Sequence, residues 1–147
     1  MECQTRRDSF LIHDLRDIPD DQSEMNMVVY ACAKLKQLLP ERFPFGVGHI
    51  STAHLIHPRD RRNKSTILLV KFEHRWLRND LFYHRHLIRD HRVSITEHLC
   101  EYRLWLLREA RRKFGYSNVY TDQGQVYRNT RNNRSLKVSS IRDIHRE

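Results

Sequence analysis

The residues of this chain best suited to chemistry are arginines that stand close together. The segment 58–64 contains four cations within six residues, Arg59, Arg61, Arg62 and Lys64. A guanidinium group presents a planar fork of N–H donors that matches phosphate oxygens, and its flat face stacks on rings. The segment therefore predicts a clamp for phosphate groups, with a solvated loop that binds nothing as the alternative.

Two further cationic clusters lie nearer the C-terminus. Arg108, Arg111 and Arg112 fall within a predicted helix, 100–113, and helical geometry places them near one another and away from the apolar side chains. The third cluster surrounds the last predicted hairpin and consists of Arg128, Arg131, Arg134 and Lys137. Both clusters predict phosphate contacts, and a merely solvated surface is again the alternative.

The distribution of charge supports a polyanionic partner. The chain has 27 Lys and Arg against 18 Asp and Glu, a net charge of +9. Residues 1–57 carry six cations and eight anions, residues 58–92 carry ten and four, and residues 93–147 carry eleven and six. Solubility alone does not require such segregation. We expect a polyanion to bind the last two-thirds of the chain.

Catalytic and metal sites are not indicated. There is no GxSxG elbow, no phosphate-binding glycine loop and no carboxylate pair in a promising context. Among ten histidines, the closest approach to ligand spacing is His84 and His86 with His91, or His54 with His57, and neither set has acidic or cysteine partners to complete it. We expect no enzymatic activity, no cofactor and no metal.

The three cysteines, Cys3, Cys32 and Cys100, are odd in number and far apart, so no disulfide framework is indicated. No apolar run approaches the length of a membrane span, and the first thirty residues do not have the pattern of a signal peptide. We expect an intracellular protein without a membrane partner, in a cytoplasmic ribonucleoprotein, in the nucleus, or in both.

Hydrophobic periodicity predicts the elements that position these residues. Strands are expected at 10–15, 50–56, 66–72 and 93–96, and helices at about 21–39 and 76–88, the first opened by Asp21 and Glu24 at capping-box spacing. This βαββαβ order predicts a ferredoxin-type α+β sandwich of the RRM kind over residues 1–97. Residues 98–147 then form a small α+β domain, with the helix 100–113, a hairpin of 119–121 and 125–127, and a third strand at 136–138.

The predicted sheet departs from a usual RRM. Such domains stack bases on aromatic side chains of the first and third strands. Here Leu11, Ile67 and Leu69 occupy those positions. An aliphatic face of this kind predicts little preference among bases. It also predicts that the face is covered, either by the C-terminal segment or by a protein partner.

With these elements in place, the chain resembles the family of the first open reading frame protein of LINE-type retrotransposons, which includes the baculovirus few-polyhedra protein. The matching segments are residues 7–15, 50–58 and STILLVKF at 65–72, and more specifically VSITEHL at 93–99, REARRKFG at 108–115, NVYTDQG at 118–124 and VSSIRDI at 138–144.

The resemblance implies that two domains form a cleft for single-stranded nucleic acid. Carried over by position, Arg59, Arg61, Arg62 and Arg108 match best, whereas Arg111, Arg112 and Lys137 rest on charge and spacing. Retrotransposon members have an upstream coiled coil that trimerises them, and no heptad repeat occurs here. The resemblance therefore does not carry trimer formation over.

We expect a sequence-tolerant binding protein for single-stranded RNA, or single-stranded DNA, that acts as a nucleic-acid chaperone of a retroelement or viral ribonucleoprotein. The alternative is a scaffold in viral or ribonucleoprotein assembly, which would use the aliphatic face for a protein partner or a homo-oligomer.

Overall fold

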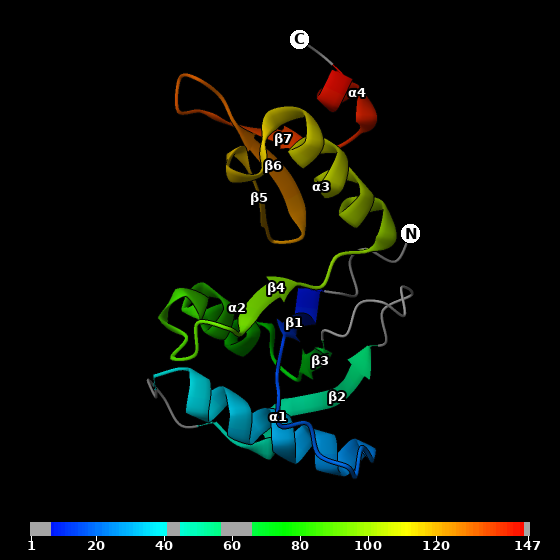
Figure 1. Ribbon diagram of the computed structural model, residues 1–147, viewed down its shortest axis with the longest axis vertical. Helices are drawn as coiled ribbons and strands as arrows, with labels where there is room; N and C mark the ends of the chain where they lie inside the picture. The colour runs from blue at the N-terminus through cyan, green and yellow to red at the C-terminus, as the bar shows by residue number, and fades with distance from the viewer. Residues whose placement is uncertain (1–6, 41–44, 57–65, 146–147) are drawn as a thin grey trace. The chain divides into compact units, whose positions relative to one another are not determined.

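The computed structural model describes residues 7–40, 45–56 and 66–145, which form an α+β protein with two antiparallel sheets (Figure 1). The α+β class is therefore confirmed. The chain divides into two compact units, Asp8–His98 and a second unit built on Leu99–Glu147. Each unit has a hydrophobic core of its own.

The first unit contains four strands and two helices among its described residues. Their order is β1 (Ser9–His13), α1 (Glu24–Leu38), β2 (Ile50–Ile56), β3 (Ile67–Phe72), α2 (Arg75–Tyr83) and β4 (Ser94–Glu97). The strands form one antiparallel sheet in the order β2-β3-β1-β4. The chain thus places its first strand between its third and its fourth.

Alternation along the strands sends apolar side chains to one face of this sheet. Phe10 and Ile12 of β1 and Leu68 and Val70 of β3 are fully buried. They share a core with buried residues of the two helices, namely Met27, Ala31 and Leu35 of α1 and Leu77 and Leu81 of α2. Burying a side chain of this size stabilises the fold by roughly 1.5–3 kcal/mol. Both helices therefore pack on the same face.

The other face of the sheet carries the three aliphatic residues singled out in the sequence. Leu11 lies opposite Leu69, and Ile67 lies opposite His13, and all four side chains are half-buried. The next strands place Thr96 beside Leu11 and exposed His54 beside Leu69. The face is therefore a mixture of aliphatic, histidine and threonine side chains.

The second unit packs helices on a three-stranded sheet. It comprises α3 (Glu101–Phe114), β5 (Val119–Asp122), β6 (Gln125–Asn129), β7 (Ser135–Val138) and α4 (Ile141–His145), with the strands in the order β5-β6-β7. Gln123 and Gly124 have φ angles of 52° and 77°, and two residues in this left-handed region make the two-residue hairpin turn that suits the twist of a sheet. The core contains Leu106, Leu107, Ala110, Val119, Val126, Val138 and Ile144.

Some sequence-based expectations were wrong in detail. Ser23, not Asp21, is the N-cap of α1, and the Asp21 carboxylate accepts the Ser23 N–H over 3.1 Å instead of closing a capping box with Glu24. Helix α2 ends at Tyr83 rather than near Ile88. Arg85 Nη1 donates to the Phe82 carbonyl over 2.8 Å, and a 3-10 turn, Arg85–Leu87, follows.

Two more features were not anticipated. Helix α4 was not predicted, because five residues are too few for a helical period to be recognised. Cys100 is disulfide-bonded, although the number and spacing of the cysteines indicated no disulfide framework, whereas Cys32 is free and buried.

Candidate nucleic-acid interface

Helix α3 carries an exposed surface that we call the α3 surface, defined by Tyr102, Trp105, Arg108 and Arg112. Residues three and four apart lie on the same side of a helix, so Trp105, Arg108 and Arg112 follow one another along it. Arg108 is exposed and has no ion pair within the described part of the chain. Arg112 is exposed and pairs with Glu109 over 3.4 Å. The α3 surface therefore presents two exposed guanidinium groups, that of Arg108 without an ion pair to a described residue and that of Arg112 in a pair with Glu109.

The aromatic residues of the α3 surface were not predicted as site residues. The rings of Tyr102 and Trp105 are stacked with centroids 6.0 Å apart, and Trp105 is 42% exposed. Large aromatic side chains left in solvent next to guanidinium groups are typical of surfaces that stack bases. The sequence could have indicated this site, because Trp105 precedes Arg108 by three residues and the two therefore lie on the same side of a helix.

Arg111 has a different environment from its two neighbours. Its guanidinium lies over the ring of Tyr116 at 4.1 Å, and its Nε is buried and has no hydrogen-bond partner among the residues described. The helix ends at Phe114, and its C-cap residue Gly115 has a φ of 94°, which favours glycine. Arg111 therefore packs against the end of the helix instead of standing in solvent with Arg108 and Arg112.

The third cationic cluster is also divided by the fold. Arg131 and Arg134 are exposed in the turn between β6 and β7, and Lys137 is exposed on β7. The backbone of this turn is held by a 2.8 Å hydrogen bond from Thr130 N to Arg134 O. Arg128 instead lies over the ring of Phe114 at 4.3 Å. Three of the four predicted cations are thus presented on an ordered hairpin.

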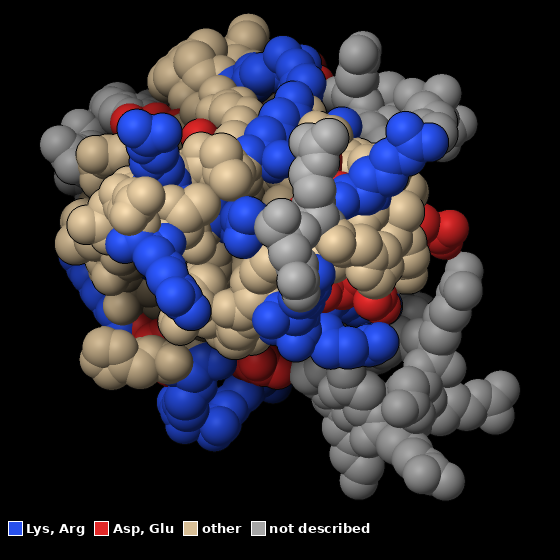
Figure 2. All heavy atoms as spheres, turned by 90° about the horizontal axis from the view of Figure 1, so that it is seen from above, with Lys and Arg blue, Asp and Glu red and all other residues tan. Residues whose placement is uncertain are grey.

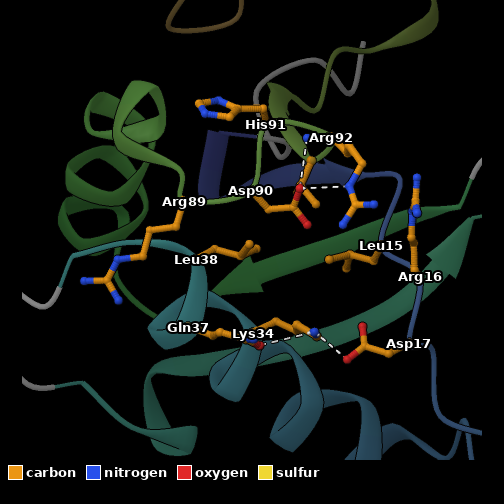
Figure 3. A pocket seen from close by; sticks show the side chains of 11 residues that line it. Leu15, Arg16, Asp17, Lys34, Gln37, Leu38, Arg89, Asp90, His91 and Arg92 are labelled. Atoms are coloured by element: carbon orange, nitrogen blue, oxygen red, sulfur yellow. Dashed lines mark hydrogen bonds and ion pairs between the residues drawn. The ribbon is translucent and has the colours of Figure 1, made fainter.

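The first unit contains a cation-lined pocket of about 870 Å³, which we call the loop pocket (Figure 3). Its walls come from the chain after β1, from the second half of α1 and from the segment before β4. Its charged and polar lining residues are Arg16, Asp17, Lys34, Gln37, Arg89, Asp90, His91 and Arg92. Sequence reasoning missed this site, because residues 16 and 89 come together only in the fold.

Ion pairs neutralise part of the loop pocket. Lys34 Nζ lies 2.5 Å from Asp17, and this hydrogen bond is the main reason that the pKa of Asp17 is below its ordinary value. Asp90 accepts hydrogen bonds from the backbone and side chain of Arg92, which lower the pKa of the Asp90 carboxyl. Both carboxylates are thus already engaged.

Two cations of the loop pocket have no such partner. The exposed side chains of Arg16 and Arg89 form no ion pair with any described residue. In Figure 3 they lie at opposite sides of the pocket. The charge of Arg16 contributes to the lowered pKa of Asp90, but neither Arg16 nor Arg89 is held in an ion pair as Lys34 and Arg92 are, and both remain exposed to an anionic ligand.

The basic segment between β2 and β3 is the cluster that the sequence predicts as a phosphate clamp. Arg59, Arg61, Arg62 and Lys64 lie outside the described residues. Figure 2 shows one face of the molecule, on which Lys and Arg side chains are widely spread and Asp and Glu side chains are fewer.

The described ranges contain neither a metal-binding cluster nor a membrane-spanning helix. No group of three or more His, Cys, Asp or Glu side chains there could hold a metal ion. No helix in the same residues is long and apolar enough to span a bilayer.

Comparison with known proteins gives no further assignment. No protein-family model matches the chain, and no curated protein matches it.

Proposed function

We propose that this protein binds single-stranded nucleic acid, RNA or DNA, through its phosphate backbone and with little regard to base sequence. The proposed role is binding, as a nucleic-acid chaperone in a retroelement or viral ribonucleoprotein, and not catalysis. The resemblance to the LINE-type first open reading frame proteins supports this role.

The observation that carries the proposal is the set of exposed cations in both units that form no ion pair with any residue the structure describes. Arg16 and Arg89 supply it in the first unit, and Arg108, Arg131 and Lys137 supply it in the second. Exposed cations that form no internal pair can replace the counterions condensed on a polyanion, and release of those counterions drives binding. Contacts of this kind position a strand without reading its bases.

The topology of the first unit supports an RRM-like assignment, which we include in the proposal. Its βαββαβ order with strands arranged β2-β3-β1-β4 agrees with the split βαβ arrangement expected of that fold. Because Leu11, Ile67 and Leu69 stand where RRM aromatics usually lie, base stacking on this sheet is not part of the proposal.

The test is a fluorescence anisotropy titration of a labelled single strand at a low and a high salt concentration. The logarithm of the binding constant should fall with the logarithm of salt concentration by about 0.7 for each phosphate contact on a single strand. Several contacts must produce a steep decrease. The proposal would be refuted if the chain did not bind the strand at low salt, or if its affinity did not change with salt concentration.

One observation favours the scaffold alternative. The half-buried pair Leu11 and Leu69 lies on the sheet face that the helices of the first unit do not cover. A protein partner on that face would be displaced by Leu11→Lys, whereas salt-dependent binding of a single strand would not change. The two roles are therefore separable in one variant.

A further inference from the structure

We propose that the exposed face of the three-stranded sheet in the second unit is a base-stacking platform for single-stranded nucleic acid, formed by Tyr120 and Tyr127 with Lys137 beside them. This site, which we call the tyrosine platform, rests on the proposed function and adds a place where bases bind. It is distinct from the α3 surface.

Strand register brings the three residues into one row. Tyr120 of β5 lies opposite Tyr127 of β6, and Tyr127 lies opposite Lys137 of β7. Side chains directly opposite one another in a sheet project from the same face. The neighbouring residues Val119, Val126 and Val138 alternate to the other face and are buried in the core with α3. The row therefore stands on the side of the sheet that α3 does not cover.

The two tyrosine rings are already arranged as a stack. Their centroids are 5.5 Å apart and their planes differ by 18°. Tyr120 is 38% exposed and donates its hydroxyl hydrogen bond to Ser135 Oγ over 2.8 Å, and Ser135 Oγ in turn donates to Asn129 Oδ1 over 3.2 Å. These bonds hold the Tyr120 ring in place before any ligand arrives. A base can extend such a stack at little cost in conformational entropy.

Cations around the rings can bind the phosphates of the nucleic-acid strand whose bases stack there. Lys137 is exposed and adjacent to Tyr127 across the strand pair. Arg131 and Arg134 are exposed in the turn that joins β6 to β7, next to Asn129 and Ser135 at the end of the platform. Aromatic rings flanked by cations are the combination that binds single strands without sequence preference.

A cross-strand tyrosine pair also stabilises a sheet by itself, so the test must separate stacking from stability. It compares binding of the full-length chain to an oligothymidylate of about 16 nucleotides and to an abasic strand of the same length. The two strands have the same phosphates and differ only in their bases. We expect the wild type to prefer the base-bearing strand by about 5-fold to 150-fold for each stacked base.

The variant Tyr127→Ile should abolish this preference and leave affinity for the abasic strand unchanged. Isoleucine suits a strand, and Tyr127→Phe and Tyr120→Phe are matched controls that keep the rings and should keep the preference. A wild type that binds both strands equally would overturn the platform but leave the proposed function intact. A preference that survives Tyr127→Ile would also overturn the platform, and failure to bind either strand would overturn both proposals.

Photocrosslinking of the wild-type chain gives a measurement that does not depend on a folded variant. A single strand containing 4-thiothymidine, irradiated in the complex and mapped by mass spectrometry, should label the peptide that contains Tyr120 or Tyr127. Crosslinks confined to Tyr102 or Trp105 would assign base stacking to the α3 surface and reject the platform.

Discussion

Arg78 of α2 and Glu97 of β4 form an ion pair inside the first unit, with Nη2 and Oε1 3.6 Å apart and both side chains at least 96% buried. Arg78 Nε also donates to the Ser9 carbonyl over 3.0 Å, and its guanidinium lies over the Phe82 ring. The Arg78 side chain thus connects α2 to β1 and β4. This buried cation serves the fold and is not available to a ligand.

Replacement of Arg78 by Met should lower the free energy of unfolding by about 3–5 kcal/mol, because it removes one partner of a buried ion pair and the hydrogen bond to the Ser9 carbonyl. Urea denaturation measures the loss. Arg75→Met is the matched control on the same helix, since Arg75 pairs with Asp8 near the surface and such pairs contribute about 0–1 kcal/mol. Equal losses in the two variants would contradict this account.

Arg108 and Arg111 should respond to substitution in opposite ways. Arg108→Gln should weaken single-strand binding and reduce the salt slope by about 0.7, with stability changed by less than about 0.5 kcal/mol. Arg111→Gln should lower stability by about 0.5–2 kcal/mol, because it removes the contact with the Tyr116 ring, and should affect binding less. Anisotropy titrations and thermal unfolding of the two variants provide the comparison. If Arg108→Gln lowered stability and Arg111→Gln weakened binding, the exposure of these side chains would not indicate which of them contacts the ligand.

His13 should make the first unit less stable in mild acid. Burial lowers its pKa below the ordinary value of 6.5, although the charge of Asp14 opposes this, and its Nε2 lies 2.7 Å from Thr96 Oγ1. Between the lowered pKa and about 6.5 the unfolded chain binds more protons than the folded one, so stability falls as pH decreases through that window and is unaffected by this group above it. Urea midpoints should decrease less across the window in His13→Gln than in the wild type. If the urea midpoints of His13→Gln and the wild type changed equally with pH, His13 would not be the cause of the loss of stability in acid.

The two halves of the chain should bind a single strand more weakly when separated. Residues 1–97 and 98–147, expressed apart, lose the effective concentration that the covalent link gives to the second binding event. Each piece must be shown by circular dichroism to be folded, because the smaller one buries little core. If folded 1–97 binds as tightly as the whole chain, the cations of the second unit are not part of the interface.

Much of the fold followed from local sequence. The run Ile50–Ile56 was predicted as a strand with the bounds that the structure has, and residues 66–72 differ from β3 by a single residue, because short apolar runs between turn residues leave few other conformations. The turn at Gln123 and Gly124 was also evident. It could even have placed Tyr120 opposite Tyr127, since a two-residue loop sets the register of the strands that it joins.

Which cations face solvent was decided by tertiary structure. In the sequence Arg108 and Arg111 are equivalent members of one cluster, and so are Arg128 and Arg131. In the fold Arg111 and Arg128 lie on the rings of Tyr116 and Phe114, since a guanidinium packs on whichever ring the chain brings to it. Arg16 and Arg89 meet in one pocket for a related reason. They are 73 positions apart, and only the pairing of β1 with β4 and the packing of α1 bring their segments together.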